Sequence, residues 1–570
     1  MVLGRKEHRG KSVINLGINY SQMHDSSASI TRDGQTLFAI AEERLSRAKH
    51  DARFPARAIQ ACLDFAAVRA ADLDFVCFGW PEPGACFRHD LASIAKGTYP
   101  ATYLNLLNST RYYASMWHQD GGTKPFLRIF GATKAQMRFV DHHLAHAISA
   151  YAFSGFDEAA VIVIDGRGAW EATSIWHGRA GRLEHVQTIP WPNSLGLFYA
   201  QFTQYLGFVP NSDEWKVMGL APYGESGINL AAFADPEDHP YCVDSRRLFG
   251  TNAAPTSGIE QILGPSREPE SEIADRHKNV AFAVQDVCER AMFTLVRSAV
   301  EKTKCRNLCL SGGVALNSKA NGKILVSGLV DNLFVQPAAG DDGVSLGAAL
   351  APYLDSGGRL PMHRMRHAYL GPEISPVEIE RALQTYKIRY EKPSDVAATA
   401  ADLLAAGKIV GWVHGRMEFG PRALGSRSIL ADPRDPEMNA RVNNAVKFRE
   451  WWRPFAPSLL AEAAGDYLEN PPDSPFMIVT SQVRPEKRSV IPSVTHVDGS
   501  ARPQTVEQSV NPLYWRLIKK FGDRTGVPVI MNTSFNLRGE PIVSSPTDAI
   551  RTFYSSGLDA LIMGPYLVNK

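Results

Sequence analysis

Two stretches of the sequence share one layout, and this repetition restricts the possible fold more than any other feature. They cover residues 11–44 and 159–190. Each begins with a β-branched run and continues through a polar loop, a second strand, a tight turn and a third strand, as in Asp33-Gly34 of the first copy. A repeated unit of strands followed by helices predicts a duplicated α/β architecture. Chance similarity between two β-meanders is the alternative.

The length and composition narrow the class of protein further. A chain of 570 residues is too long for one core and predicts two or three domains. A net charge of +2 argues against a nucleic-acid partner. No apolar run approaches the roughly 18 residues of a membrane span, and the basic N-terminus leads straight into a strand. We therefore expect a cytoplasmic protein that does not bind membranes.

The cysteine content also favours a cytoplasmic protein. There are seven, an odd number, and none lies in a CxxC pair. A disulfide framework or a zinc knuckle is therefore not expected, and buried free thiols are the better prediction.

Histidines crowd the segment "DHHLAHA", where His142, His143 and His146 lie within five positions. In a helix of 3.6 residues per turn, His142 and His146 share a face and His143 points elsewhere. Two imidazoles at this spacing can bind one metal ion, but the glutamate of the HExxH hydrolases is missing. Histidines packed against a neighbouring element are an equally good interpretation of the spacing alone.

Two later turns also have the composition of binding sites. In "NLCLSGGVALNSK" an apolar strand runs into Gly312-Gly313 before a helix, so backbone amides could approach an anionic ligand. A tight turn that simply needs glycine is the alternative. In "GDDG", one of Asp341 and Asp342 is expected to cap the following small-residue helix. The other aspartate has no such explanation.

The composition of the chain changes after a Gly- and Pro-containing stretch at 351–375. Such a stretch is typical of a linker and predicts a domain boundary near residue 372. An alanine-rich helix and a strand follow, and then a loop with many arginines. The basic residues of this part include Arg416, Arg422, Arg427, Arg434, Lys447, Arg449 and Arg453. Forked guanidinium groups beside glycine and proline favour capture of phosphate or carboxylate. A charged surface with arginine–carboxylate pairs is the competing interpretation.

The ordered set "DHHLAHA … VIDGRG … WKVMGLAPYG … SGGVALN … GDDG … GRMEFGPRALGSRSIL … VKFREWWRPFAPS … DGSARPQ … MNTSFNLRGEPIV" resembles the NodU/CmcH-type O-carbamoyltransferases over almost the whole chain. The resemblance implies an N-terminal domain, 1–372, similar to the ATPase-fold protein that makes threonylcarbamoyladenosine. That fold is a duplicated ribonuclease H-like α/β domain shared with sugar kinases and actin. It also implies a C-terminal YrdC-like α/β domain, 373–570.

The chemistry implied by this resemblance has two steps. Carbamoyl phosphate and ATP, with Mg²⁺, give a carbamoyl-adenylate and pyrophosphate in the C-terminal domain. The N-terminal domain then transfers the carbamoyl group to a hydroxyl of a small metabolite, with an aminoglycoside as the favoured acceptor. Competing interpretations are a sugar-kinase-like phosphotransferase and a nucleotide-binding partner in RNA modification. The sequence does not indicate an oligomeric state.

The resemblance also implies roles for individual residues. Fe²⁺, or another divalent metal that such ligands suit equally, would be bound by His142, His146, Asp165 and Asp341. The adenosine end would lie on Gly312, Gly313 and Asn317. His24 would assist deprotonation of the acceptor hydroxyl, since a near-neutral histidine suits a general base, although a hydrogen-bonded loop histidine is the alternative. Lys447 and Arg502 are the expected cations of adenylate formation. The remaining phosphate-site residues are Arg416, Arg449, Arg453 and Asn532.

Overall fold

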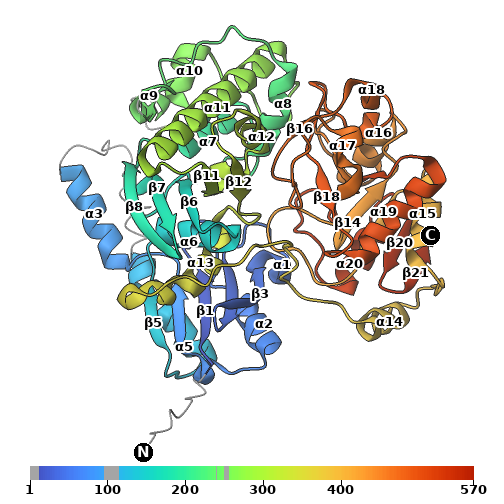
Figure 1. Cartoon of the computed structure of the whole chain (residues 1–570), viewed down its shortest axis with the longest axis horizontal. Coiled ribbons are helices and arrows are strands. Elements are labelled where there is room, and N and C mark those ends of the chain that lie inside the picture. The colour runs from blue at the N-terminus through green and yellow to red at the C-terminus, as the bar shows by residue number, and fades with distance from the viewer. Residues whose placement is uncertain (1–11, 96–113, 239, 250–255) are drawn as a thin grey trace, which may run out of the picture.

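The computed structural model describes residues 12–95, 114–238, 240–249 and 256–570, so Lys11, the first residue of the repeated unit, lies outside the described residues. The chain forms two lobes, which are separated in Figure 1 by colour, from blue to green in the first and from orange to red in the second.

The first lobe contains two five-stranded sheets with the same topology. One has the order β3-β2-β1-β4-β5, from β1 (Ile14–Asn19), β2 (Ser27–Arg32), β3 (Gln35–Ala41), β4 (Phe75–Phe78) and β5 (Gln136–Phe139). The other has the order β12-β11-β6-β7-β8, from β6 (Glu158–Ile164), β7 (Glu171–Arg179), β8 (Arg182–Pro190), β11 (Asn307–Ser311) and β12 (Asn332–Val335). In each, an antiparallel three-stranded meander is extended by two parallel strands. The predicted duplication is therefore present in the mixed α/β fold.

The tight turns of the two repeated units have matching backbones. Asp33 and Gly34 have φ of 51° and 81°, and Ala180 and Gly181 have φ of 48° and 76°. Positive φ at both central residues defines the type I′ turn, whose twist matches that of the flanking strands.

Two helices form the layer between these sheets. Helix α6 (His142–Ser154) packs on the second sheet, α13 (Val344–Leu350) packs on the first, and the two helices pack on each other. They approach so closely that a Cβ atom at Gly347 would lie 1.8 Å from the carbonyl oxygen of Ala145. The small residues of "VSLGAAL" are thus required by packing, and the contact brings the start of α6 close to the start of α13.

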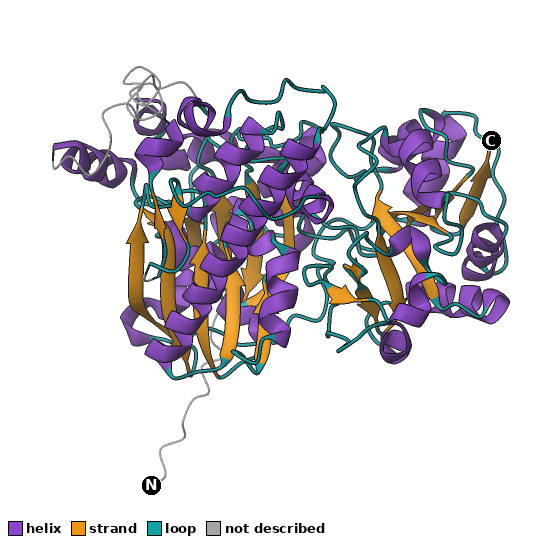
Figure 2. Ribbon diagram, turned by 90° about the horizontal axis from the view of Figure 1, so that it is seen from above, coloured by secondary structure: helices purple, strands orange, loops and turns teal. Residues whose placement is uncertain are grey.

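The remaining helices of this lobe lie around the two sheets (Figure 2). They are α1 (Glu42–Ser46), α2 (Ala56–Ala66), α3 (Pro83–Ala95), α5 (Thr123–Phe130), α7 (Leu195–Tyr205), α8 (Glu214–Leu220), α9 (Ser245–Phe249), α10 (Ser257–Leu263), α11 (Asp275–Thr303) and α12 (Ser318–Val326), with the short strands β9 (Ala234–Asp235) and β10 (Cys242–Val243).

The second lobe is built on one seven-stranded sheet of order β18-β15-β19-β14-β13-β20-β21. Its strands are β13 (Val410–Val413), β14 (Arg427–Ala431), β15 (Ala456–Leu460), β18 (Gln504–Val506), β19 (Val529–Ser534), β20 (Ala560–Met563) and β21 (Tyr566–Asn569). Helices α15 (Val396–Ala405) and α19 (Pro512–Thr525) bury one face, and α14 (Pro376–Thr385) and α20 (Pro546–Tyr554) pack against the other. Shorter elements complete it: α16 (Met438–Val442), α17 (Ala464–Tyr467), α18 (Pro485–Arg488), β16 (Ser481–Gln482) and β17 (Ser500–Ala501).

The segment expected to be a linker is fixed along both lobes. Its Leu360 N–H donates to the Gly181 carbonyl at 2.8 Å, and its Met365 N–H donates to the Phe153 carbonyl at 2.8 Å. Further on, Gly371 and Met417 are joined by an N–H···O bond of 2.9 Å. We call residues 358–373 the strap, because its peptide groups are bonded to the first lobe at one end and to the second lobe at the other.

The lobes also share a core. Residues 476–479 of the second lobe are buried in the hydrophobic cluster of the first, and Asn321 Nδ2 donates to the Ile478 carbonyl at 2.9 Å. All seven cysteines are free, and five are buried. Within the described residues, every helix is too short or too polar to cross a membrane.

Candidate functional site

A continuous cavity of about 750 Å³ lies between the lobes. Its wall in the first lobe includes Asp165 and Asp341, and its wall in the second lobe includes Arg449 and Arg502. The carboxyl ends of β6 and β12 therefore open into the same space as the arginine loops of the second lobe.

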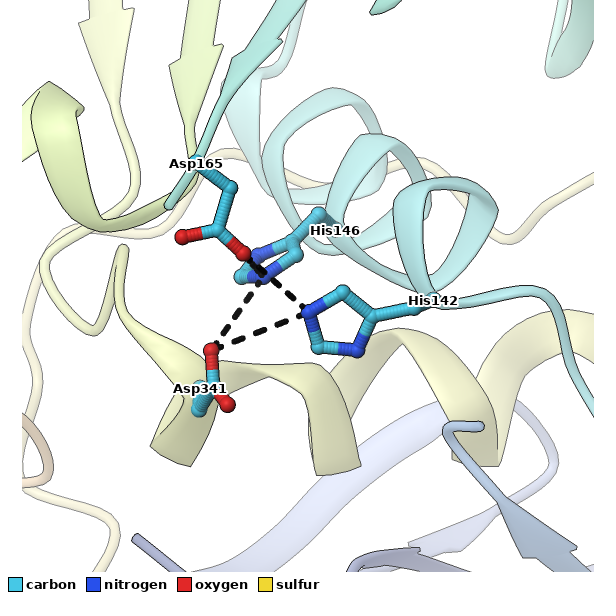
Figure 3. A group of neighbouring side chains, drawn as sticks. All are labelled: His142, His146, Asp165 and Asp341. Carbon is cyan, nitrogen blue, oxygen red and sulfur yellow. Dashed lines mark hydrogen bonds and ion pairs between the residues drawn. The ribbon is translucent and has the colours of Figure 1, made fainter. Parts of the chain in front are cut away.

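At the first-lobe end the four predicted metal ligands come together (Figure 3). Their ligand atoms all lie within 4.8 Å of one another. His142 Nε2 is 3.3 Å from Asp165 Oδ2 and 3.7 Å from Asp341 Oδ1. His146 Nε2 is 3.8 Å and 3.9 Å from the same two oxygens. The first two turns of α6 supply the histidines, the end of β6 supplies Asp165, and the turn before α13 supplies Asp341.

The Nδ1 atoms of the two imidazoles have hydrogen-bond partners that fix the orientation of the rings. His142 Nδ1 lies 3.1 Å from the Gly79 carbonyl, and His146 Nδ1 lies 3.0 Å from Ser311 Oγ. Both Nε2 atoms consequently face the carboxylates, and that of His146 is buried without a hydrogen-bond partner. Buried polar atoms rarely stay unpaired, and a ligating histidine typically has its second nitrogen bonded in this way. The two-nitrogen, two-oxygen set fits a divalent cation such as iron, manganese or zinc.

Without a cation, the cluster retains a proton. Burial opposes protonation of His142, but the hydrogen bond that it donates to Asp165 and the charge of Asp341 raise its pKa to about 9. Burial raises the pKa of Asp341 to about 6. Since metal ligands must be deprotonated, a divalent cation would bind here in exchange for that proton.

His143 stands apart from this cluster. Its Nδ1 lies 2.8 Å from Ser174 Oγ on β7, and burial lowers its pKa to about 3. It is a neutral packing residue, in line with its place on another face of α6.

Asp342 does not have the capping role considered from the sequence. Neither aspartate of the GDDG turn makes a side-chain cap bond to the helical turn there or to α13. Asp342 lines the cavity instead, where burial raises its pKa to about 7.

His24 lies at the cavity but is not poised as a base. Its Nδ1 is 3.0 Å from Asp25 Oδ2 and its Nε2 is 2.7 Å from the Asn211 carbonyl. Both partners are acceptors, so both nitrogens of His24 carry protons. Burial opposes this charge, but Asp25 outweighs it and raises the pKa of His24 to about 10. The near-neutral pKa on which the base assignment rested is therefore absent.

This charge state predicts a pH-dependent stability of the metal-free protein. The His24 pKa of about 10 exceeds its ordinary value of 6.5, so its contribution is complete below pH 6.5 and is lost as the pH rises through 10. We expect His24→Gln to cost stability at pH 6 and progressively less toward pH 10, as measured by urea unfolding. Asp25→Asn should remove the pH dependence, and an equal cost at all pH values would contradict the assignment.

The glycine turn is only partly available to a ligand. Gly313 lines the cavity, with its N–H 3.3 Å from Asp165 Oδ1. Gly312 has φ of +88°, and a Cβ there would lie 2.3 Å from the Ile164 carbonyl oxygen, so the turn itself requires glycine. Asn317 reaches the cavity wall, but its amide caps α12 at Ala320 and exchanges two 3.0 Å bonds with Gln285. Asn317 therefore holds the turn together, and its amide is not free for adenosine.

At the second-lobe end the wall carries a cluster of cations, Arg422, Arg449, Arg453 and Arg502. Only Arg453 has a carboxylate partner among them, Glu450 at 3.3 Å, within the residues that the structure describes. The charges acting on Arg502 are those of Arg422 and Arg453, which together with burial depress its pKa. Buried cations without counter-charges are costly, so this wall is suited to an anion. Arg422 was only one of several loop arginines in the sequence; its place after Pro421 at the cavity was not predicted.

Two residues assigned to this pocket lie elsewhere. The ammonium group of Lys447 is enclosed by oxygens of Ser534 and Asn536, including Asn536 Oδ1 at 2.8 Å, and holds the end of β19 behind the cavity wall. Arg416 donates to main-chain carbonyls of the strap and of Leu37 and stacks over Phe65 at 4.5 Å. Neither lines the cavity. Asn532 does, and its Oδ1 lacks a partner.

The chain is similar to bacterial proteins over almost its whole length. An uncharacterized protein of Synechocystis sp. is 39% identical over 97% of this chain and 96% of its own. Nodulation protein NolNO of Sinorhizobium fredii is 40% identical over 96% of this chain and 79% of its own. Among solved structures, component A of (R)-2-hydroxyglutaryl-CoA dehydratase from Acidaminococcus fermentans covers 60% of this chain and 97% of its own, with 15% identity and a TM-score of 0.33, too low to support an argument.

Two family models match most of the sequence. "Carbamoyltransferase N-terminus" matches residues 14–350, and "Carbamoyltransferase C-terminus" matches residues 401–570. The first match contains the histidine–aspartate cluster and the second contains the arginine cluster. The chain belongs to the NodU-type carbamoyltransferase family.

Proposed function

We propose that this carbamoyltransferase depends on ATP, forms a carbamoyl-adenylate from carbamoyl phosphate, and transfers the carbamoyl group to a hydroxyl of a small metabolite. One observation carries the proposal. A single cavity is lined in one lobe by the two aspartates of the histidine–aspartate cluster and in the other by the arginine cluster, of which only Arg453 has a carboxylate partner among the described residues.

The arginine end is suited to adenylate formation, as in the YrdC-like domain that the sequence resembles. Carbamoyl phosphate, ATP and one water balance to carbamoyl-adenylate, pyrophosphate and phosphate. The reaction concentrates negative charge on phosphate oxygens, and fixed cations stabilise such charge without reorganisation. Arg422, Arg449 and Arg502 would bind these oxygens, and Mg²⁺ would accompany the ATP.

The other end is suited to transfer. His142, His146, Asp165 and Asp341 would hold Fe²⁺ or another divalent ion, which as a Lewis acid would offset charge on the adenylate phosphate. The acceptor oxygen would bond to the carbamoyl carbon while the bond from that carbon to the adenylate oxygen breaks. AMP would leave with the electron pair, and its phosphate would take up the hydroxyl proton. His24, with both nitrogens protonated, would donate a hydrogen bond instead of accepting the hydroxyl proton.

The continuous cavity also bears on the intermediate. A carbamoyl-adenylate reacts with water, so an enzyme gains by keeping it out of bulk solvent between its two steps. Because Asp341 and Arg502 line the same cavity, the adenylate could pass between the half-sites without leaving the protein.

The acceptor is proposed from sequence resemblance alone. We infer from the motif set that the chain resembles nebramycin 5′ synthase, the tobramycin O-carbamoyltransferase of antibiotic biosynthesis. Two of the acidic residues near the cavity give no reason of their own to favour a cationic sugar, since Glu43 is paired with Arg44 and Asp213 with Lys216. Tobramycin is therefore the first acceptor to test, by mass spectrometry for the carbamoyl mass increment.

The donor chemistry has a direct test. Purified protein mixed with carbamoyl phosphate, ATP and Mg²⁺ should release pyrophosphate, and AMP should accumulate once an acceptor is added. Omitting carbamoyl phosphate should stop both products. Formation of ADP would contradict the adenylate and favour a kinase, and tight tRNA binding at moderate salt would favour a role in RNA modification.

A further inference from the structure

One helix of the first lobe lies directly against the arginine loop of the second. Along α8 and the turn after it, positions 215, 219 and 223 are four residues apart and so share one face. A Cβ atom at Gly219 would lie 3.5 Å from Pro454 Cδ, and the ring of Tyr223 lies 5.0 Å from that of Trp451. This face therefore meets residues 451–454 of the other lobe.

The third member of this face contacts a cavity arginine. The Arg453 guanidinium lies 3.4 Å from the ring centroid of Trp215, and both residues line the cavity. The indole is itself fixed, because its Nε1 donates to the Ser212 carbonyl at 2.8 Å. Arg453 Nε is buried and has no hydrogen-bond partner, so the stacking contact is a principal restraint on this guanidinium.

A second contact reaches Arg453 from the same helix. Glu450 binds Arg453 through one oxygen at 3.3 Å and Lys216 Nζ through the other at 2.9 Å. Lys216 is in turn paired with Asp213 at 3.0 Å. Two consecutive residues of α8 thus restrain one arginine. Trp215 stacks on the guanidinium of Arg453, and Lys216 binds its carboxylate partner, Glu450.

We propose that Trp215 is a positioning residue through which the first lobe completes the anion site of the second. An arginine side chain loses considerable freedom when it is fixed, and stacking on an indole fixes the guanidinium plane before an anion arrives. The proposal rests on the proposed function, since it assumes that the arginine cluster binds the phosphates of the substrates. It adds that this cluster is assembled only when the two lobes are docked.

The test measures binding of inorganic pyrophosphate to the full-length protein by calorimetry. Trp215→Leu keeps most of the apolar volume but removes the π face, and we expect it to weaken binding by about tenfold, within the range for a partly desolvated cation–π contact. Trp215→Phe restores an aromatic face and should bind within about threefold of wild type. A purely space-filling role would instead leave Trp215→Leu at wild-type affinity.

Trp451→Ala is the matched control. Trp451 is 60% exposed, meets Tyr223 edge to face at the same junction and does not line the cavity. It should leave pyrophosphate affinity unchanged. Equal weakening by Trp451→Ala and Trp215→Leu would mean general loosening of the junction and would overturn the proposal, as would wild-type affinity in Trp215→Leu. If the wild-type protein itself does not bind pyrophosphate, the anion site of the proposed function fails and this inference fails with it.

Discussion

Replacing His146 with alanine is expected to abolish carbamoyl transfer to the acceptor while pyrophosphate release continues. His146 Nε2 is buried and faces Asp165 and Asp341 without a hydrogen bond, so its removal takes one of four ligands from the cluster. Loss of a group that only orients a ligand costs about 10- to 100-fold in metal affinity or activity, and loss of a ligand should exceed that. The arginine end of the cavity is untouched, so adenylate formation should persist.

The measurements are metal content by elemental analysis and the two half-reactions assayed separately. His143→Ala is the control, because His143 lies on the same helix and is equally buried, but its Nδ1 faces Ser174. That variant should be less stable yet retain metal. Loss of pyrophosphate release together with transfer in His146→Ala would show that the half-sites are not separate.

Replacing Arg502 with alanine should have the opposite effect on the two steps. We expect pyrophosphate formation to fall by at least about 100-fold, the typical loss on removing one preorganised donor from a charge-stabilising site. Transfer from carbamoyl-adenylate supplied directly should remain measurable. The reason is that Arg502 lines the cavity beside Arg422 and Arg453 in the second lobe, whereas the histidine–aspartate cluster belongs to the first lobe.

The same substitution should not lower the stability of the ligand-free protein. Arg502 is desolvated and repelled by its neighbours, and removing such a charge relieves an unfavourable interaction. Thermal unfolding should therefore show an unchanged or higher midpoint for Arg502→Ala, and pyrophosphate should no longer raise it. Arg434→Ala is the control, since Arg434 is paired with Asp432 at 2.6 Å. A loss of activity explained by unfolding of Arg502→Ala would contradict this account.

Local signals in the sequence were sufficient to predict the duplicated sheets of the first lobe. The β-branched runs and the Asp33-Gly34 turn predicted strands and hairpins that the sheets contain. The i, i+4 spacing of His142 and His146 likewise predicts directly that they share one face of a helix. These features depend on a few adjacent residues, so no tertiary contact was needed to infer them.

The roles of several other residues depend on partners that are distant in the chain. The charge of His24 comes mainly from its neighbour Asp25, but its Nε2 is directed by the distant Asn211 carbonyl. The amide of Asn317 is likewise fixed by the distant Gln285. Lys447 ends a π-helical turn and is followed by Phe448 with φ of 47°. Its side chain consequently points toward Asn536, whereas Arg449, two residues later, reaches the cavity. Proximity in a motif does not determine side-chain direction.

The strap restricts how this enzyme family can be recombined. A chimera with the second lobe of a relative would naturally be spliced near residue 372, where composition changes. That splice would fall inside the backbone pairing of Gly371 and Pro372 with Met417, so each parent would contribute only half of a paired ladder. Exchangeable modules should instead keep residues 368–373 with residues 416–419, and the crossover belongs upstream of them.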